Sequence, residues 1–206
     1  MYDPSTRYEF RCFGQCFEAE ERQLRAMTEL DSITESSETY FIGPSLDLEH
    51  NVKIRSGKLE LKLLIDDRDG LERWQPAGQW AFPVAADTVL ELLLPDHDGS
   101  LKDTLPARLN RNELLGFAAR PDIPLYRAEV FKRRFQFILS PCRAEVDQLL
   151  INGAAILSLA VESEDLNAVQ HLQETLRIAG HENVSYPLAL SRIMGMSAQS
   201  RVNGRA

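Results

Sequence analysis

Apolar and charged residues alternate in several short segments of this 206-residue chain. The first segment covers residues 7–12, where Arg7, Glu9 and Arg11 are separated by Tyr8, Phe10 and Cys12. Side chains of a β-strand point alternately to opposite faces. The pattern therefore predicts a strand with one charged and one apolar face.

A second alternation, over residues 52–63, predicts a hairpin. Lys53 and Arg55 alternate with apolar neighbours before Ser56-Gly57, and Lys58, Glu60 and Lys62 alternate with leucines after it. A two-residue polar turn with glycine between two such runs is typical of a tight β-hairpin.

Three more strands follow in the last third of the chain. Residues 131–137 alternate except at Arg133, residues 143–147 continue in step, and residues 157–164 end in Glu162-Ser163-Glu164. Helical spacing instead predicts helices near residues 18–30, 85–94, 111–119, 166–176 and 187–194. Residues 66–79, with Asp69-Gly70 and Pro76, favour a loop, and the small polar segment 197–206 favours a flexible tail.

Composition changes this picture little. A chain of this length with 44% hydrophobic residues can form one substantial core, so we expect a single domain over residues 1–196. The three cysteines form no metal-binding or disulfide pattern, and no signal peptide or membrane span is evident, which favours a cytoplasmic protein without membrane contact. A net charge of −8 without a Lys/Arg block argues against nucleic acid as a partner.

Charge on the predicted strand faces runs against this acidic total. The alternating positions carry nine basic residues, Arg7, Arg11, Lys53, Arg55, Lys58, Lys62, Lys132, Arg134 and Arg143, and six acidic ones, Glu9, Glu60, Glu145, Asp147, Glu162 and Glu164. A basic site in an acidic protein favours an anionic ligand. Cross-strand ion pairs on a solvated sheet face are the alternative.

Several of these motifs, in this order, resemble those of the CYTH superfamily of triphosphate tunnel metalloenzymes. Lys132-Arg133-Arg134 resembles the KxR element of that superfamily, Glu162-Ser163-Glu164 its C-terminal ExE pair, and residues 39–41 its tyrosine-containing strand. Residues 52–55 and 59–62 are similar to its paired basic strands. The likeness covers nearly the whole chain.

The resemblance implies an α+β fold, an antiparallel β-barrel with a charged lumen and with helices packed outside. It also implies a phosphorylated small molecule as ligand and Mg²⁺ or Mn²⁺ as cofactor. The implied phosphate-binding residues are Arg11, Lys53, Arg55, Lys62, Lys132 and Arg134, and the implied metal ligands are Glu9, Asp147, Glu162 and Glu164. Guanidinium and ammonium groups suit phosphate oxygens, and carboxylates suit these hard cations.

The N-terminal strand departs from the ExExK signature of the superfamily. Here the best register reads Arg7-Tyr8-Glu9-Phe10-Arg11, which keeps only the middle glutamate. Arginine removes a metal ligand and stays protonated, so it cannot replace lysine as a base. Metal-dependent triphosphate hydrolysis, a binding module without turnover, and adenylyl cyclisation therefore all remain as hypotheses, in that order.

Overall fold

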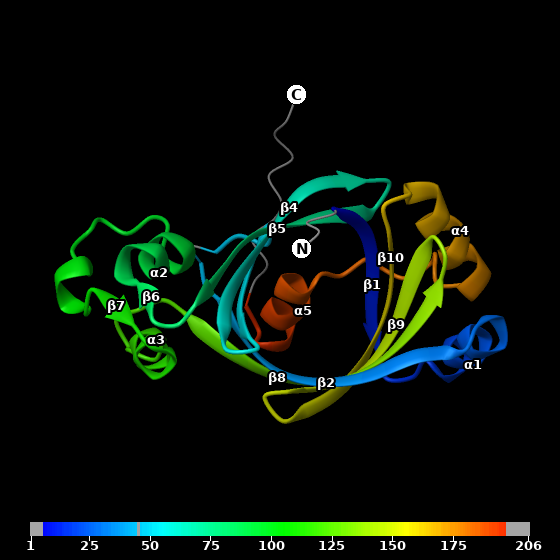
Figure 1. The fold of residues 1–206 in the computed structure, drawn as a ribbon, viewed down its shortest axis with the longest axis horizontal. Helices are drawn as coiled ribbons and strands as arrows, with labels where there is room; N and C mark the ends of the chain where they lie inside the picture. The colour runs from blue at the N-terminus through cyan, green and yellow to red at the C-terminus, as the bar shows by residue number, and fades with distance from the viewer. Residues whose placement is uncertain (1–5, 45, 197–206) are drawn as a thin grey trace.

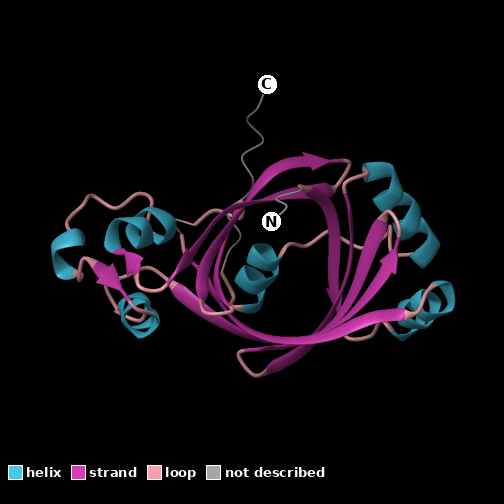
Figure 2. Ribbon diagram, viewed as in Figure 1, coloured by secondary structure: helices cyan, strands magenta, loops and turns pink. Residues whose placement is uncertain are grey.

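In this computed structural model, which describes residues 6–44 and 46–196, eight strands form a closed antiparallel barrel (Figures 1 and 2). Around the barrel the order is β1-β10-β9-β8-β2-β3-β4-β5. These strands are β1 (Arg7–Gly14), β2 (Leu30–Ile42), β3 (His50–Arg55), β4 (Lys58–Arg68), β5 (Leu71–Ala81), β8 (Tyr126–Leu139), β9 (Cys142–Ile151) and β10 (Ala154–Ser163). The predicted fold class is confirmed. The predicted tail, residues 197–206, lies outside the described residues.

The β3–β4 hairpin forms as the alternation predicts. Arg55 pairs with Lys58 across Ser56 and Gly57, whose φ angles are 50° and 72°. A turn with positive φ at both central residues matches the twist of the flanking strands. The prediction of a loop at residues 66–79 is wrong, because β4 and β5 extend through it and turn at Asp69-Gly70. Pro76 is tolerated beside a shift in register between Leu61 and Lys62.

Helices cover the outside of the barrel at two places (Figure 1). Helix α1 (Glu18–Met27) and helix α4 (Leu166–Leu176) cover one side, where α4 packs on β1, β9 and β10. The insertion between β5 and β8 lies on the other side and comprises β6 (Val84–Ala85), α2 (Ala86–Leu93), η1 (Lys102–Thr104), β7 (Arg108–Leu109) and α3 (Arg111–Ala118). Its apolar residues share a buried cluster with β3 and β4 residues such as Val52 and Leu59.

Helix α5 (Tyr186–Ile193) has a different position, within the ring of strands (Figure 1). Its Tyr186 and Leu190 pack against Tyr40, Val130 and Leu149, and a small apolar cluster results. Val130 has the same strand parity as Lys132, and Leu149 the same as Asp147, so these apolar residues face inward. Helix α5 therefore fills one part of the interior and leaves the other part polar.

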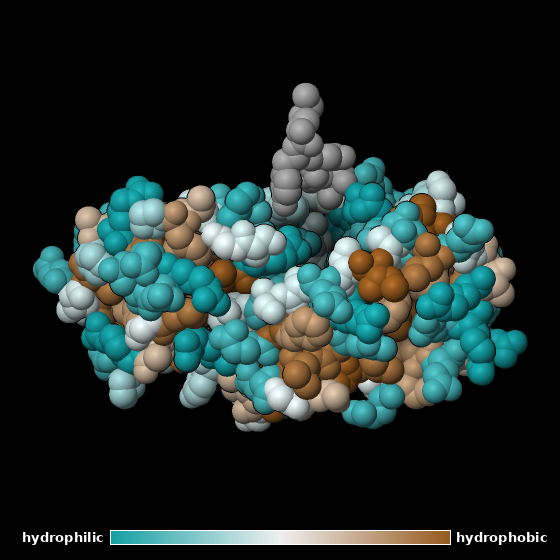
Figure 3. Space-filling model, turned by 60° about the horizontal axis from the view of Figure 1, so that its bottom comes forward, coloured by the Kyte–Doolittle hydropathy of each residue, from teal (hydrophilic) through white to brown (hydrophobic). Residues whose placement is uncertain are grey.

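The outer surface, by contrast, is mixed in character. Ile33, Phe131 and Leu150 on β2, β8 and β9 are exposed hydrophobic residues. Figure 3, which brings this side of the molecule forward, shows hydrophobic residues between hydrophilic ones. No helix within the described residues is long and apolar enough to cross a membrane.

Candidate functional site

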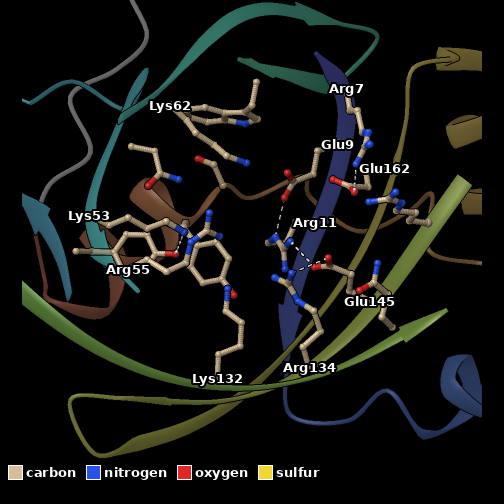
Figure 4. Close-up of a pocket in the computed structure, with 17 residues that line it drawn as sticks. Arg7, Glu9, Arg11, Lys53, Arg55, Lys62, Lys132, Arg134, Glu145 and Glu162 are labelled. Carbon is tan, nitrogen blue, oxygen red and sulfur yellow. Dashed lines mark hydrogen bonds and ion pairs between the residues drawn. The ribbon is translucent and has the colours of Figure 1, made fainter. Parts of the chain in front are cut away.

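The polar part of the barrel interior is a cavity of about 360 Å³ (Figure 4). Its basic lining residues are Arg7, Arg11, Lys53, Arg55, Lys62, Lys132, Arg134 and Arg143, its acidic ones are Glu9, Glu145 and Glu162, and its uncharged ones are Tyr40, Asn51, Trp74, Gln136, Ser185 and Tyr186. Eight basic groups against three carboxylates give the lining a formal charge of +5, in a chain of net charge −8.

Strand alternation brings these side chains together. All six predicted phosphate-binding residues line the cavity, and they come from β1, β3, β4 and β8. Two predicted metal ligands, Glu9 and Glu162, line it as well and are direct register partners on β1 and β10. The charged groups of these strands therefore face one enclosed space rather than separate outer surfaces.

The other two predicted metal ligands are placed differently. Asp147 is fully buried and lies beneath the lining, where it is bonded to Arg11 and Arg134. Glu164 follows the end of β10 at Ser163, is exposed, and does not line the cavity.

One wall of the cavity is basic. Figure 4 shows Lys53, Arg55, Lys62 and Lys132 on the same side of the space, opposite Glu9, Glu145 and Glu162. Arg55 pairs with Glu60 at 2.9 Å. Among the described residues, Lys62 has no ion-pair partner within 4.0 Å, and its charge acts on Glu9 only from a longer distance.

A buried carboxylate, Glu38 of β2, supports this wall from behind. Its Oε2 accepts hydrogen bonds from Lys53 Nζ at 2.9 Å and from the Tyr40 hydroxyl at 2.7 Å, and it lies 4.0 Å from Lys132 Nζ. The alternating pattern of the sequence did not identify Glu38 as a site residue. Strand alternation could have indicated it, because Glu38 is two residues before Tyr40 on the same strand and its side chain therefore points to the same side of the sheet.

One carboxylate shared by two buried ammonium groups leaves both lysines under-compensated. Burial lowers the pKa of Lys53 to about 7 and that of Lys132 to about 8, although Glu38 acts in the opposite direction. Burial alone would raise the pKa of Glu38, but the two lysines hold it well below its ordinary value. An anion in the cavity would supply the negative charge that these lysines lack.

The opposite wall is organised around Arg11. Its Nε donates to Glu9 at 2.8 Å, Nη1 to Asp147 at 3.2 Å and to the Ser158 hydroxyl at 3.1 Å, and Nη2 to Glu145 at 3.3 Å. The guanidinium can reach across β10 because its register neighbour there is the small Ala160. Four of about five guanidinium N–H groups are thus already committed to protein acceptors.

The pKa values of the carboxylates around Arg11 are shifted in different directions. Burial would raise the pKa of Glu9, but Arg11 and then Lys62 outweigh burial and lower it. Burial likewise opposes the lowering of the Asp147 pKa, which Lys132, Arg11 and Arg134 bring about. For Glu145, burial prevails over Arg134 and raises the pKa.

These carboxylates do not fit a divalent cation. Each of the three that line the cavity already has an arginine partner: Glu9 is bonded to Arg11, Glu162 to Arg7 at 2.8 Å, and Glu145 to Arg134 at 3.0 Å. A metal ion bound to any of them would lie close to a guanidinium charge, which would repel it. Nowhere in residues 6–44 and 46–196 do three or more His, Cys, Asp or Glu residues form a metal-binding group.

Aromatic residues also line the cavity, namely Tyr40, Trp74 and Tyr186. Tyr186 stacks on Tyr40 with 5.3 Å between ring centroids, and Lys132 Nζ lies 4.2 Å from the centroid of the Tyr186 ring. Trp74, from the segment expected to be a loop, lines the cavity near the β1–β5 seam. The position of Trp74 depends on the register of β5, which the sequence did not predict.

A closed antiparallel barrel with a cationic interior is thus the class of structure that the fold and site define. The sequence matches no protein-family model and no curated protein. Solved structures are similar in fold. A conserved hypothetical protein from Pyrococcus furiosus superimposes with a TM-score of 0.50 over 88% of this chain and 99% of its own, at 15% identity.

Two further solved structures have TM-scores slightly below that value. The PH1819 protein from Pyrococcus horikoshii reaches 0.47 at 17% identity, over 90% of this chain and 99% of its own. The Hippeastrum protein HpAC1, described as having a dominant triphosphatase activity, reaches 0.48 at 12% identity, over 93% and 97%. The fold implied by the CYTH resemblance is the fold observed.

Proposed function

We propose that this barrel binds an anionic small molecule carrying several linked phosphates, of the tripolyphosphate class. The observation that carries the proposal is the enclosed lining of eight basic residues and three carboxylates. A cavity of about 360 Å³ is of the size that holds small ligands. Closely spaced phosphates match closely spaced ammonium and guanidinium groups, which bind their oxygens by charge-assisted hydrogen bonds.

The arrangement of charges supports a linear anion along the basic wall. Lys62 carries no ion pair in the described structure, and Lys53 and Lys132 share one carboxylate. Unpaired, partly buried charge is unfavourable in the absence of a ligand. A bound polyphosphate would relieve this cost, because its oxygens would supply the missing acceptors.

Binding without turnover is the form of the proposal that the residues support. The CYTH resemblance implies hydrolysis with Mg²⁺ or Mn²⁺, and adenylyl cyclisation as a further activity of that superfamily. Both activities need carboxylates that are free to hold a cation, and here the lining carboxylates are engaged by arginines.

Isothermal titration calorimetry with tripolyphosphate tests the proposal. We expect saturable binding to the wild type and affinity about 10- to 100-fold weaker for Lys62→Ala, since a charge-assisted hydrogen bond contributes about 1.5–3 kcal/mol. Lys58→Ala is the matched control on the same strand, because Lys58 is exposed and bonds to Gln79 rather than lining the cavity. Absence of binding to folded wild-type protein would refute the proposal.

A phosphate-release assay separates binding from hydrolysis. We expect no release from tripolyphosphate or nucleoside triphosphates with Mg²⁺ or Mn²⁺, and no cyclic AMP from ATP. Turnover abolished by Lys62→Ala and retained by Lys58→Ala would instead show that the cavity is an active site.

A further inference from the structure

Three carboxylates in this barrel converge on a side chain rather than on free space. Glu9 from β1 and Glu145 and Asp147 from β9 each accept a hydrogen bond from Arg11, at distances from 2.8 to 3.3 Å. Ser158 adds a hydroxyl oxygen at 3.1 Å. Oxygen atoms of several carboxylates around one positive centre are the kind of environment that divalent cations occupy in proteins.

We infer that the Arg11 guanidinium is a built-in cation that takes the place of a divalent metal, so that the cavity binds its polyphosphate without metal. This inference rests on the proposed function and states which form of the ligand is recognised. The wild-type site would select the free anion over its Mg²⁺ complex.

Burial and local sequence both fit this role. Arg11 is only 5% exposed, and Asp147, its deepest partner, is fully buried. Ala160 and Ser158 of β10 lie between β1 and β9, and their small side chains leave the space that the guanidinium occupies. The position is therefore shaped for a large planar cation with fixed hydrogen-bond directions, which is the property that distinguishes arginine from lysine.

The other arginine–carboxylate ion pairs of the site also disfavour a metal ion. Arg7 is bonded to Glu162, and Arg134 is bonded to both Glu145 and Asp147. A Mg²⁺ ion carried in by a polyphosphate would have to displace one of these arginines or approach within a few ångströms of it. Because like charges at this separation repel strongly in a poorly solvated cavity, the complexed ligand should bind less well.

Calorimetry of the wild type provides the first test. We expect tripolyphosphate to bind in EDTA, and the affinity to fall by about tenfold or more with Mg²⁺ in excess, as free anion is depleted and repulsion is added. Binding that requires Mg²⁺, or that Mg²⁺ tightens, overturns the inference while leaving the proposed function intact. No binding in either condition means that the proposed function itself has failed.

A second test uses Mn²⁺ as the probe, without polyphosphate, and electron paramagnetic resonance to count bound ions. We expect negligible Mn²⁺ binding to the wild type and at least about tenfold tighter binding to Arg11→Ala, because Glu9 then has no arginine partner and Glu145 and Asp147 keep only Arg134. Arg143→Ala is the matched control, because Arg143 also lines the cavity but has no carboxylate partner within 4.0 Å among described residues. Strong Mn²⁺ binding to the wild type contradicts the inference, and this result does not depend on whether Arg11→Ala folds.

Discussion

Lys53 should take up a proton when the cavity binds a polyanion. Burial lowers its pKa to about 7 in the free protein, so at pH 7.5 about three-quarters of the molecules carry a neutral Lys53. Lys132, with a pKa of about 8, is neutral in about a quarter. A phosphate anion beside both lysines favours their charged forms and raises both pKa values.

The size of the effect follows from these two values. If the bound anion keeps both lysines charged at pH 7.5, binding is accompanied by uptake of about one proton. Affinity should therefore fall by about tenfold per pH unit near pH 7.5, which is about 1.4 kcal/mol per unit, and more steeply above pH 8, where Lys132 is mostly neutral as well. Below pH 6 both lysines are charged before binding, and their contribution to the pH dependence disappears.

Titrations with tripolyphosphate in buffers of different ionisation enthalpy measure this uptake directly. Lys53→Arg is the matched variant, because arginine stays charged in this pH range. The difference in uptake between wild type and variant cancels the protonation of the ligand itself, and we expect it to be about 0.8 proton at pH 7.5. Equal uptake by the two proteins would refute the reasoning that Lys53 is neutral in the free cavity and charged in the complex.

Three further predictions concern stability. Glu38→Gln should lower the free energy of unfolding by about 3–5 kcal/mol in urea denaturation, because two buried lysines lose their carboxylate. A change under about 1 kcal/mol would contradict the pairing of Glu38 with Lys53 and Lys132. From pH 7 to pH 9 the ligand-free protein should gain about 2 kcal/mol through Lys53, because the unfolded chain binds more protons in this range when the folded pKa is lowered. Lys53→Arg should keep only the smaller rise that comes from Lys132; a weaker rise in the variant than in wild type would identify Lys53, whereas identical profiles would exclude it. Tripolyphosphate at about 100 times its dissociation constant should add about 2.7 kcal/mol to the free energy of unfolding of the wild type. It should raise the melting temperature of the wild type more than that of Lys62→Ala. Equal shifts in melting temperature would indicate binding outside the cavity.

Much of the barrel could be predicted because alternation is a local signal. The hairpin at Ser56-Gly57 and the inward-facing charges of β1, β3, β4 and β8 follow from the period-two patterns of the individual strands. Strand pairing then places these faces next to one another. The β4–β5 hairpin could not be predicted in the same way. Pro76 indicates a loop by its own propensity, but cross-strand pairing on both sides of a register shift overrides that signal.

The hydrogen bonds and ion pairs inside the site depend on strand register, which could not be predicted from the sequence. Arg11 is 134 and 136 residues from Glu145 and Asp147 along the chain. Their contact needs β10 between them to carry Ala160 and Ser158 at the matching positions. The amphipathic pattern of α5 likewise does not distinguish a helix outside the barrel from one inside it, so the stacking of Tyr186 on Tyr40 was not expected.

A crystal structure of the protein with tripolyphosphate in the presence of EDTA tests the central claim most directly. We predict one anion inside the barrel, with phosphate oxygens within hydrogen-bond distance of Lys53, Lys62 and Lys132, and with Arg11 still bonded to Glu9. An anion confined to the outer surface, with the cavity unchanged, would contradict the claim.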